Sequence, residues 1–483
     1  MGEKSLRTTT LRGIGWSSID SIANQGITFL VGLVLARLLG PEEYGLIGII
    51  TIFVNLFNTI VDSGFSNALI RKKESTEDDY NTVFITNLVL SVVLGISLFL
   101  SAPIIAKFFK QTALIPISKV MSTIVVINAF AIIQRTNLVK KIDFKTQTKA
   151  SLISSLSSGA IGIIMAVMGY GVWALVGQQL SRQLLNTISL WFYNRWIPKM
   201  RFSKKSFKEL FSFSWKLLLS QLITSLWNEV NHIVIGRCYS SQALGQYTRS
   251  HQFASIFSSN LTSIIQRVSF PVLSSIQDEK ERMKQAYRKI IKITMFVAFC
   301  CMFVLAAVSK PLIYVLIGEK WDEAASYLPL LCFMLVLYPI RAINTNMLQV
   351  CGRSDQLLIL EIIKKTLAVG PLLLGVFVSI RSMLFASVLV DIIGFILNSH
   401  FSGKYIKYST WSQVKDIFPS FTIAAFVALF TYLLSFIHVS YYYVLVIQLI
   451  FAFLAIVALS ELFNIAEYKE IKALVQRIIK KII

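Results

Sequence analysis

The chain has 483 residues, of which 55% are hydrophobic and 15% charged, and its formal net charge at pH 7 is +22. So high a hydrophobic fraction excludes an ordinary soluble domain. Such a charge on a soluble protein would indicate nucleic acid, but here the basic residues lie in loops between long apolar stretches, so we expect contact with membrane lipids and no nucleic-acid partner.

Apolar stretches long enough to cross a bilayer as helices fill the chain almost from end to end. We predict fourteen spans, in this order: 14–36, 44–66, 82–102, 114–135, 150–168, 172–194, 213–235, 243–269, 290–317, 325–349, 357–378, 383–401, 417–437 and 441–463. Most of the 47 Lys and Arg residues fall on one side if the N-terminus is inside. Positive loops stay in the cytoplasm, so we predict a multi-pass protein of the bacterial inner membrane with both termini cytoplasmic.

A repeat of 200 residues joins the two halves of the chain. Ala36-Arg37 ends the first predicted span and Gly45 begins the second, while Gly236-Arg237 and Gly245 do the same for spans seven and eight. An even number of spans separates the copies, so they share one orientation in the membrane. We predict an all-α fold of two pseudo-symmetric six-helix lobes, 1–200 and 201–405, followed by two further helices over 406–463.

The C-terminal segment 464–483 has apolar residues at roughly helical spacing, with Lys and Arg between them. This pattern is typical of an amphipathic helix on the surface of a membrane, so we expect the tail to lie on the cytoplasmic leaflet.

Polar side chains recur at helical spacing along spans one, two, seven and eight. Polar groups are costly in hydrocarbon, and ionisable ones usually face the interior of a bundle or a watery cavity. Because these spans correspond under the repeat, we expect them to enclose one central cavity, as in an alternating-access transporter. The alternative is that the amides only bond neighbouring helices. The residues singled out are Asp20 and Asn24 in span one, Asn55 and Asp62 in span two, Asn228, Glu229 and His232 in span seven, and Arg249, Asn260 and Arg267 in span eight.

Cations outnumber acids inside the two lobes. The planar fork of Arg suits phosphate oxygens, so we predict a cationic cavity that binds an anionic, phosphate-bearing substrate. The candidate cations are Arg182, Lys216, Arg249, Arg267 and Arg341. Lys216 and Arg267 have the alternative of reaching the cytoplasmic interface, which makes the other three the stronger candidates.

Ala36-Arg-Leu-Leu-Gly-Pro-Glu-Glu-Tyr-Gly-Leu-Ile-Gly48 resembles the turn between the first two helices of the polysaccharide transporter family. These are the Wzx-type flippases of the multidrug/oligosaccharidyl-lipid/polysaccharide exporter superfamily. Leu348-Gln-Val-Cys-Gly-Arg353 and the following Leu357–Lys365 resemble the loop between helices ten and eleven of that family. The resemblance covers essentially the whole chain, and it is strongest to members associated with colanic-acid and teichuronic-acid export.

The resemblance implies a flippase for exopolysaccharide or lipopolysaccharide biosynthesis. Its substrate would be undecaprenyl-pyrophosphate-linked oligosaccharide, and its partners a polysaccharide polymerase and glycosyltransferases. Such proteins are thought to use ion gradients, for which Asp20, Asp62, Glu229 and His232 are our coupling candidates; the alternative is that Glu229 only neutralises a nearby Arg.

Three other functions remain open. A lipid II flippase also has fourteen helices and a cationic cavity, whereas a drug/cation antiporter would need a mostly acidic one. A membrane-embedded polymerase or acyltransferase would carry a large external loop or an intramembrane His/Asp pair, and neither is evident. The five cysteines form no CxxC pair and the four histidines show no HExxH spacing. We therefore expect no catalytic residue, no cofactor and no metal.

Overall fold

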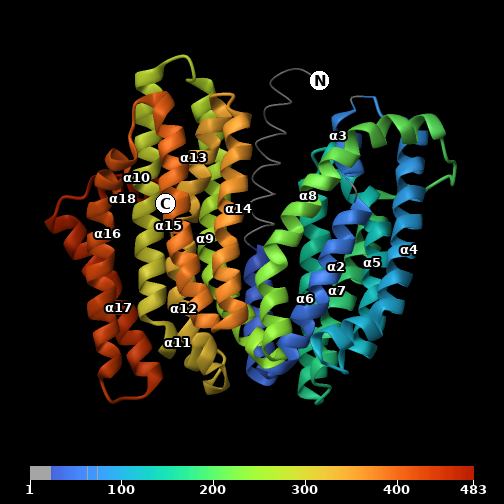
Figure 1. The fold of residues 1–483 in the computed structure, drawn as a ribbon, viewed down its shortest axis with the longest axis horizontal. Coiled ribbons are helices and arrows are strands. Elements are labelled where there is room, and N and C mark those ends of the chain that lie inside the picture. Colours follow the sequence, from blue (N-terminus) through green and yellow to red (C-terminus); the bar gives the residue numbers. More distant parts are fainter. Residues whose placement is uncertain (1–22, 63, 73, 483) are drawn as a thin grey trace. The chain divides into compact units, whose positions relative to one another are not determined.

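The structure is a computed structural model that describes residues 23–62, 64–72 and 74–482, and these residues form helices without any strand (Figure 1). The first helix covers Ala23–Leu38. The others are α2 (Pro41–Asp62), α3 (Phe65–Arg71), α4 (Glu77–Phe109), α5 (Leu114–Lys140), α6 (Phe144–Val167), α7 (Val172–Asn194), α8 (Lys204–Cys238), α9 (Ser241–Ser275), α10 (Lys280–Ala307), α11 (Ser309–Leu316), η1 (Glu319–Trp321), α12 (Asp322–Leu335), α13 (Tyr338–Val350), α14 (Ser354–Phe377), α15 (Ile380–Ile406), α16 (Thr410–Leu433), η2 (Leu434–Phe436), α17 (Tyr441–Leu462) and α18 (Ala466–Ile482).

Packing divides the chain into two compact units, Met1–Gly245 and Gln246–Ile483. The first unit includes α8, which packs against α2, α3 and α4. This helix follows residue 200, where the sequence repeat places the boundary between lobes. The lobes 1–200 and 201–405 therefore describe the sequence repeat, and they stay a prediction. The boundary between the two packing units comes one helix later in the chain, after α8.

Nine helical stretches of the described residues are long and apolar enough to cross a membrane. They confirm an all-α, multi-pass membrane protein. The helices α7, α8, α9 and α14 have 23, 35, 35 and 24 residues and are long enough to cross a bilayer, but they carry more polar and charged side chains. The count of fourteen spans therefore remains a proposal.

Three of the predicted spans are interrupted. The span 44–66 ends at Asp62 and continues as the short α3 after Gly64, whose φ of 69° is a left-handed conformation that favours glycine. The span 325–349 divides into α12 and α13, with Pro339 in the first turn of α13. Proline lacks the N–H that would continue the preceding helix. The span 290–317 divides into α10 and α11 at Val308.

The turn that carries the family resemblance is a helix start. α2 begins at Pro41, where the missing N–H has no intrahelical partner to lose. The backbone N–H of Gly40 donates to Glu43 Oε2 at 2.9 Å, which is one half of a capping box. Tyr44 donates through its hydroxyl to the carbonyl of Gly32 at 3.4 Å, and so fastens α2 to the helix before it.

The two glycines of the repeat pack against one another's helix starts. A methyl group on Gly45 would lie 1.7 Å from the carbonyl oxygen of Ser241. A methyl group on Gly245 would lie 1.8 Å from the carbonyl oxygen of Pro41. Only glycine permits so close a backbone approach. The repeat thus encodes a reciprocal contact between the first turns of α2 and α9.

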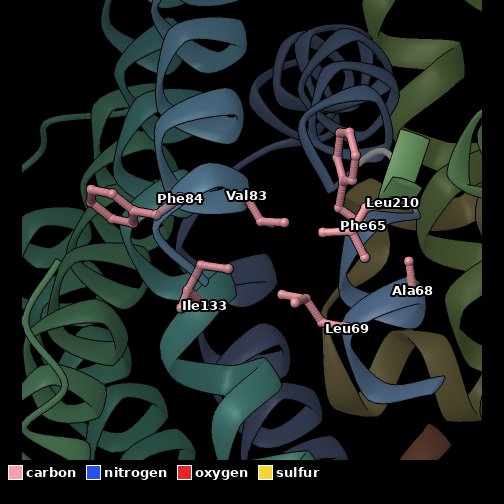
Figure 2. Close-up of a cluster of buried hydrophobic side chains, with 7 residues drawn as sticks. All are labelled: Phe65, Ala68, Leu69, Val83, Phe84, Ile133 and Leu210. Atoms are coloured by element: carbon pink, nitrogen blue, oxygen red, sulfur yellow. The ribbon is translucent and has the colours of Figure 1, made fainter. Parts of the chain in front are cut away.

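Buried apolar side chains from α3, α4, α5 and α8 hold one end of the first unit together (Figure 2). They are Phe65, Ala68, Leu69, Val83, Phe84, Ile133 and Leu210. Charged groups surround this cluster: Lys72 Nζ lies 2.9 Å from Asp79 Oδ2 and 3.1 Å from Glu209 Oε2. The hydrogen bond to Asp79 raises the pKa of Lys72, with the contact to Glu209 acting in the same direction. Glu209 is exposed, so its contact with Lys72 adds little stability, whereas the buried Asp79 depends on the hydrogen bonds that it accepts from Lys72 and from the backbone of Thr76.

The C-terminal helix α18 is joined to α10 by ion pairs. Lys289 Nζ lies 2.8 Å from Glu470 Oε2, and Lys292 Nζ lies 2.6 Å from Glu467 Oε1. Glu467 is buried in this contact. The predicted amphipathic helix over 464–483 therefore has a partner within its own unit, and its position on the cytoplasmic leaflet stays a prediction.

The reciprocal contact predicts that a glycine-to-alanine substitution lowers the stability of the protein at the two repeat glycines but not at a glycine elsewhere in a helix. Gly45→Ala and Gly245→Ala should each force two backbones apart and lower stability by about 1–3 kcal/mol. Gly370→Ala is the matched control, because Gly370 lies in α14 with nothing within 4 Å of an added methyl group. It should be neutral or stabilise by about 0.5–1 kcal/mol, since glycine weakens a helix interior. Thermal unfolding of the purified variants in detergent measures this, and equal melting temperatures for all three variants would contradict it.

Candidate functional site

Three amide side chains connect α2, α5 and α7 within the first unit. Asn128 Nδ2 donates to Asn58 Oδ1 at 3.1 Å, and Gln183 Nε2 donates to Asn128 Oδ1 at 3.0 Å. Such bonds contribute about 0.6 kcal/mol each on average in membrane proteins, so the chain of amides mainly fixes the rotation of the three helices. Sequence analysis did not single out Asn128, a lone polar residue among apolar ones, or Gln183, which follows Arg182 in a polar stretch of its span.

Arg182 precedes Gln183 on α7 and is half-buried. Its guanidinium has no hydrogen bond or ion pair with any other residue that the structure describes. An arginine at membrane depth costs several kcal/mol or more without a partner, and such residues mark substrate or ion pathways. The amide chain holds the helix that carries Arg182 against α2 and α5.

Glu229 and His232 lie together on α8, as their spacing predicts. His232 Nδ1 lies 3.4 Å from Glu229 Oε2, and Asn55 Nδ2 on α2 donates to Glu229 Oε1 at 3.2 Å. Three of the predicted residues therefore meet at one place in the first unit. In the described part of the chain, an amide and a histidine contact Glu229, rather than an arginine.

A second acidic position lies at the end of α2. Asp62 accepts a hydrogen bond from Ser66 Oγ at 2.5 Å, and it interacts electrostatically with Arg135 on α5. Sequence analysis did not single out Arg135, which is the last residue of the predicted span 114–135. Asp62 thus has a basic neighbour within its own unit, which distinguishes it from Glu229.

Asn24 joins the first helix to α6. Its Nδ2 donates to Ser151 Oγ at 2.6 Å, and its Oδ1 accepts from Ser155 Oγ at 2.7 Å. This contact matches the interhelical use of polar residues in membranes, the alternative weighed in the sequence analysis. Asp20, the other candidate in this span, lies outside the described residues.

Three of the remaining predicted residues of α8 and α9 are exposed, and the fourth bonds within its own helix. Lys216, Asn228 and Arg267 are exposed, and the ammonium of Lys216 lies 5.9 Å from the ring of Trp215. Asn260 donates to the carbonyl of Ile256 in its own helix at 2.7 Å. Exposed cations at these positions fit contact with lipid headgroups or solvent as well as with substrate.

In the second unit, Arg249 and Arg341 are both engaged. Arg249 is 4% exposed, and its Nη1 donates to Gln252 Oε1. Arg341 on α13 forms an ion pair with Asp391 on α15. Its guanidinium also lies 5.6 Å from the centre of the Tyr338 ring. Among the described residues, no group of three or more His, Cys, Asp or Glu side chains is placed to hold a metal ion.

Residues 34–326 match the sequence profile of the family described as "Polysaccharide biosynthesis protein". The chain belongs to this family. The family is one of membrane transporters and not of enzymes, in agreement with the resemblance found at Ala36–Gly48.

Two characterised relatives align with most of the chain. "Succinoglycan biosynthesis transport protein ExoT" of Rhizobium meliloti (strain 1021) is 25% identical over 434 residues, which are 82% of this chain and 88% of the relative. "Teichuronic acid biosynthesis protein TuaB" of Bacillus subtilis (strain 168) is 26% identical over 354 residues, 73% of each chain. The chain is thus a multi-pass transporter of polysaccharide biosynthesis.

The fold is similar to that of a solved flippase. "Lipid II flippase MurJ, inward closed conformation" superposes with a TM-score of 0.75 at 14% sequence identity, covering 92% of this chain and 98% of that one. At this identity the likeness shows the fold alone.

Proposed function

We propose that this polysaccharide transporter moves undecaprenyl-pyrophosphate-linked oligosaccharide units from the cytoplasmic to the external leaflet of the bacterial inner membrane. The proposal includes fourteen spans in two six-helix lobes, and alternating access around a cationic cavity. The names of the relatives support it, since they are proteins of succinoglycan transport and teichuronic acid biosynthesis. Surface polysaccharide assembly requires such a step, because lipid-linked units made at the cytoplasmic face cannot cross hydrocarbon unaided.

Arg182 is the observation that carries the substrate class. It is a half-buried cation with no partner in the described chain, and a network of amides holds its helix. A pyrophosphate offers several anionic oxygens to the planar donor fork of an arginine. A transporter for organic cations would instead place acidic groups there.

A lipid II flippase remains the main alternative, because it would share both the fold and an anionic headgroup. The two substrates differ in the sugar and peptide part, which the charged residues described here do not recognise. The drug/cation antiporter is the weaker alternative, because Arg182 has no hydrogen bond or ion pair with any described residue. Membership of a transporter family excludes the polymerase and the acyltransferase.

The proposed orientation has a direct test in cysteine labelling. The turn Gly169–Gly171 should be external and Lys204 cytoplasmic, because the basic loops face the cytoplasm. In a background without the five native cysteines, a membrane-impermeant maleimide added to intact cells should modify Tyr170→Cys and spare Lys204→Cys. Tyr170 is exposed and lies between two glycines of positive φ, so reagent access is not limited by packing. Labelling of Lys204→Cys alone would reverse the topology.

Replacing Arg182 with Ala should stop polymer export while membrane insertion continues. Arg182→Lys should restore it only in part, because the ammonium lacks the bidentate fork. Arg282→Ala is the matched control: Arg282 is exposed and pairs with Glu279 three residues away. Export is measured as surface polysaccharide in cells that depend on the variant, with the protein level in the membrane as a reference. Normal export by Arg182→Ala would leave this residue without a role in binding.

We further propose that Glu229 couples transport to an ion gradient, together with His232. The carboxylate has an amide and a histidine beside it, so it can exchange a proton or bind a cation. Asp20 and Asp62 are the other coupling candidates, with Asp62 the weaker because Arg135 and Ser66 already engage it.

Glu229→Gln should keep binding of the lipid-linked oligosaccharide but abolish the gradient dependence of its transport in proteoliposomes. The amide keeps the shape and the hydrogen-bonding capacity of the side chain while it removes the charge. Glu209→Gln, which removes a more exposed carboxylate of the same helix, should leave the gradient dependence intact. An unchanged response in Glu229→Gln, Asp20→Asn and Asp62→Asn alike would refute ion coupling at these residues.

A further inference from the structure

Asp391 stands opposite Arg341 inside the second unit. The Nη1 atom of Arg341 donates to Asp391 Oδ1, and the two side chains are only 17% and 18% exposed. A methyl group on Gly394, one turn after Asp391, would lie in ordinary van der Waals contact with both cations, 3.5 Å from Arg341 Nη1 and 3.7 Å from Lys364 Cδ. The pair therefore lies where α13, α14 and α15 come together (Figure 1).

The charged groups described near this place are two cations and two carboxylates. Lys364 on α14 interacts electrostatically with Asp391, while its ammonium lies 2.5 Å from Glu361, which is half exposed. Tyr338 on α13 is the further titratable neighbour, with its ring against Arg341. Among the described residues, the other helices that pack on α15 bring no charged group to Asp391. Arg288 of α10 pairs with Asp416 of α16 beside Tyr408, which follows the end of α15 and lies more than four turns beyond Asp391, and the acids of α12 lie in its first turn.

A buried polar seam continues from the ion pair along α15. Asn398 and Ser402 follow Asp391 at spacings of seven and eleven residues, so they share its face. Ser402 contacts the Tyr287 hydroxyl at 3.2 Å, and this hydroxyl donates to Asn344, one turn after Arg341. The side chain of Asn398 is 0% exposed, and its amide has no hydrogen-bond partner among the described residues. The polar face of α15 therefore extends from Asp391 into the buried interior of the second unit.

We propose that Asp391 is an internal competitor for Arg341: it occupies the guanidinium while the transporter is empty, and the pyrophosphate of the lipid-linked substrate displaces it. This role rests on the proposed function and adds to it the control of one cationic contact. A carboxylate and a phosphate present similar pairs of oxygens to an arginine fork, so they compete for the same donors. Arg341 without any partner would be costly at this depth, and Asp391 removes that cost between substrates.

Protonation of Asp391 has a defined effect on this competition. The carboxylate takes a proton from water and becomes a neutral acid, while Arg341 keeps its charge. Substrate then meets a free guanidinium, so acidification should strengthen binding of the headgroup through this residue. The Arg288–Asp416 pair is different, because Tyr408 also donates to Asp416 and Arg288 is half exposed. The Arg288–Asp416 pair is therefore the matched control, an Asp–Arg pair at which we propose no binding of substrate.

The test measures binding of geranylgeranyl pyrophosphate to the full-length protein in detergent, with geranylgeraniol as the probe that lacks the headgroup. Asp391→Asn should tighten binding of the pyrophosphate by about tenfold at pH 7.5, as expected if Arg341 is free one-tenth of the time. Asp416→Asn should leave the affinity unchanged. The double variant Arg341→Ala/Asp391→Asn should bind no more tightly than Arg341→Ala, since the gain acts through Arg341. Geranylgeraniol should not distinguish the variants.

The pH dependence of the unmodified protein gives an independent measurement if Asp391→Asn does not fold. Its affinity for the pyrophosphate should rise as the pH is lowered and Asp391 takes up a proton, and this rise should be absent in Arg341→Ala. Unchanged or weaker binding by a folded Asp391→Asn, or the same rise in Arg341→Ala, would overturn the competition. Failure of the unmodified protein to bind any pyrophosphate lipid would instead refute the proposed function, so the two failures can be told apart.

Discussion

The cost of charge within a membrane governs the arrangement of this transporter. An arginine or an aspartate among apolar helices must find a partner, reach water or bind a ligand. In the second unit the charge has found a partner, because Arg341 on α13 forms an ion pair with Asp391 on α15. Arg182 on α7 has no such partner in the described chain, although its neighbour Gln183 belongs to a chain of amides. The contrast between Arg341, which is paired, and Arg182, which has no partner among the described residues, is the observation behind our proposal of an anionic substrate.

Close backbone packing is the second constraint. Gly45 and Gly245 allow the first turns of α2 and α9 to touch through their carbonyl oxygens. The same turn contains Pro41 and Glu43, which begin and cap α2. The stretch by which the family is recognised therefore has a structural role, and its residues are distinct from those that would bind substrate.

Composition and loop charge were sufficient to predict an all-helical, multi-pass membrane protein, because the need to bury backbone groups in lipid leaves few other folds. The repeat glycines were visible in the sequence, but their mutual contact was not, since spacing alone does not say which helices touch. Helical periodicity correctly brought Glu229 beside His232, and the structure added Asn55 from another helix. The alternatives weighed in the sequence analysis describe Asn24, which bonds a neighbouring helix, and Arg267, which is exposed, whereas the exposure of Asn228 was not foreseen. Polar stripes of this kind identify a face of a helix, and only packing decides whether that face meets a neighbour, a ligand or lipid.

The central claim is that the protein moves lipid-linked oligosaccharide across a bilayer, and reconstitution tests it most directly. Purified protein would be placed in liposomes that contain undecaprenyl-pyrophosphate-linked oligosaccharide, and a membrane-impermeant glycosidase added outside. The account predicts that the protein makes the units in the inner leaflet accessible to the enzyme, and that Arg182→Ala leaves them protected to the same extent as protein-free liposomes. Accessibility that is the same with and without the protein, under an imposed ion gradient in either direction, would contradict the account.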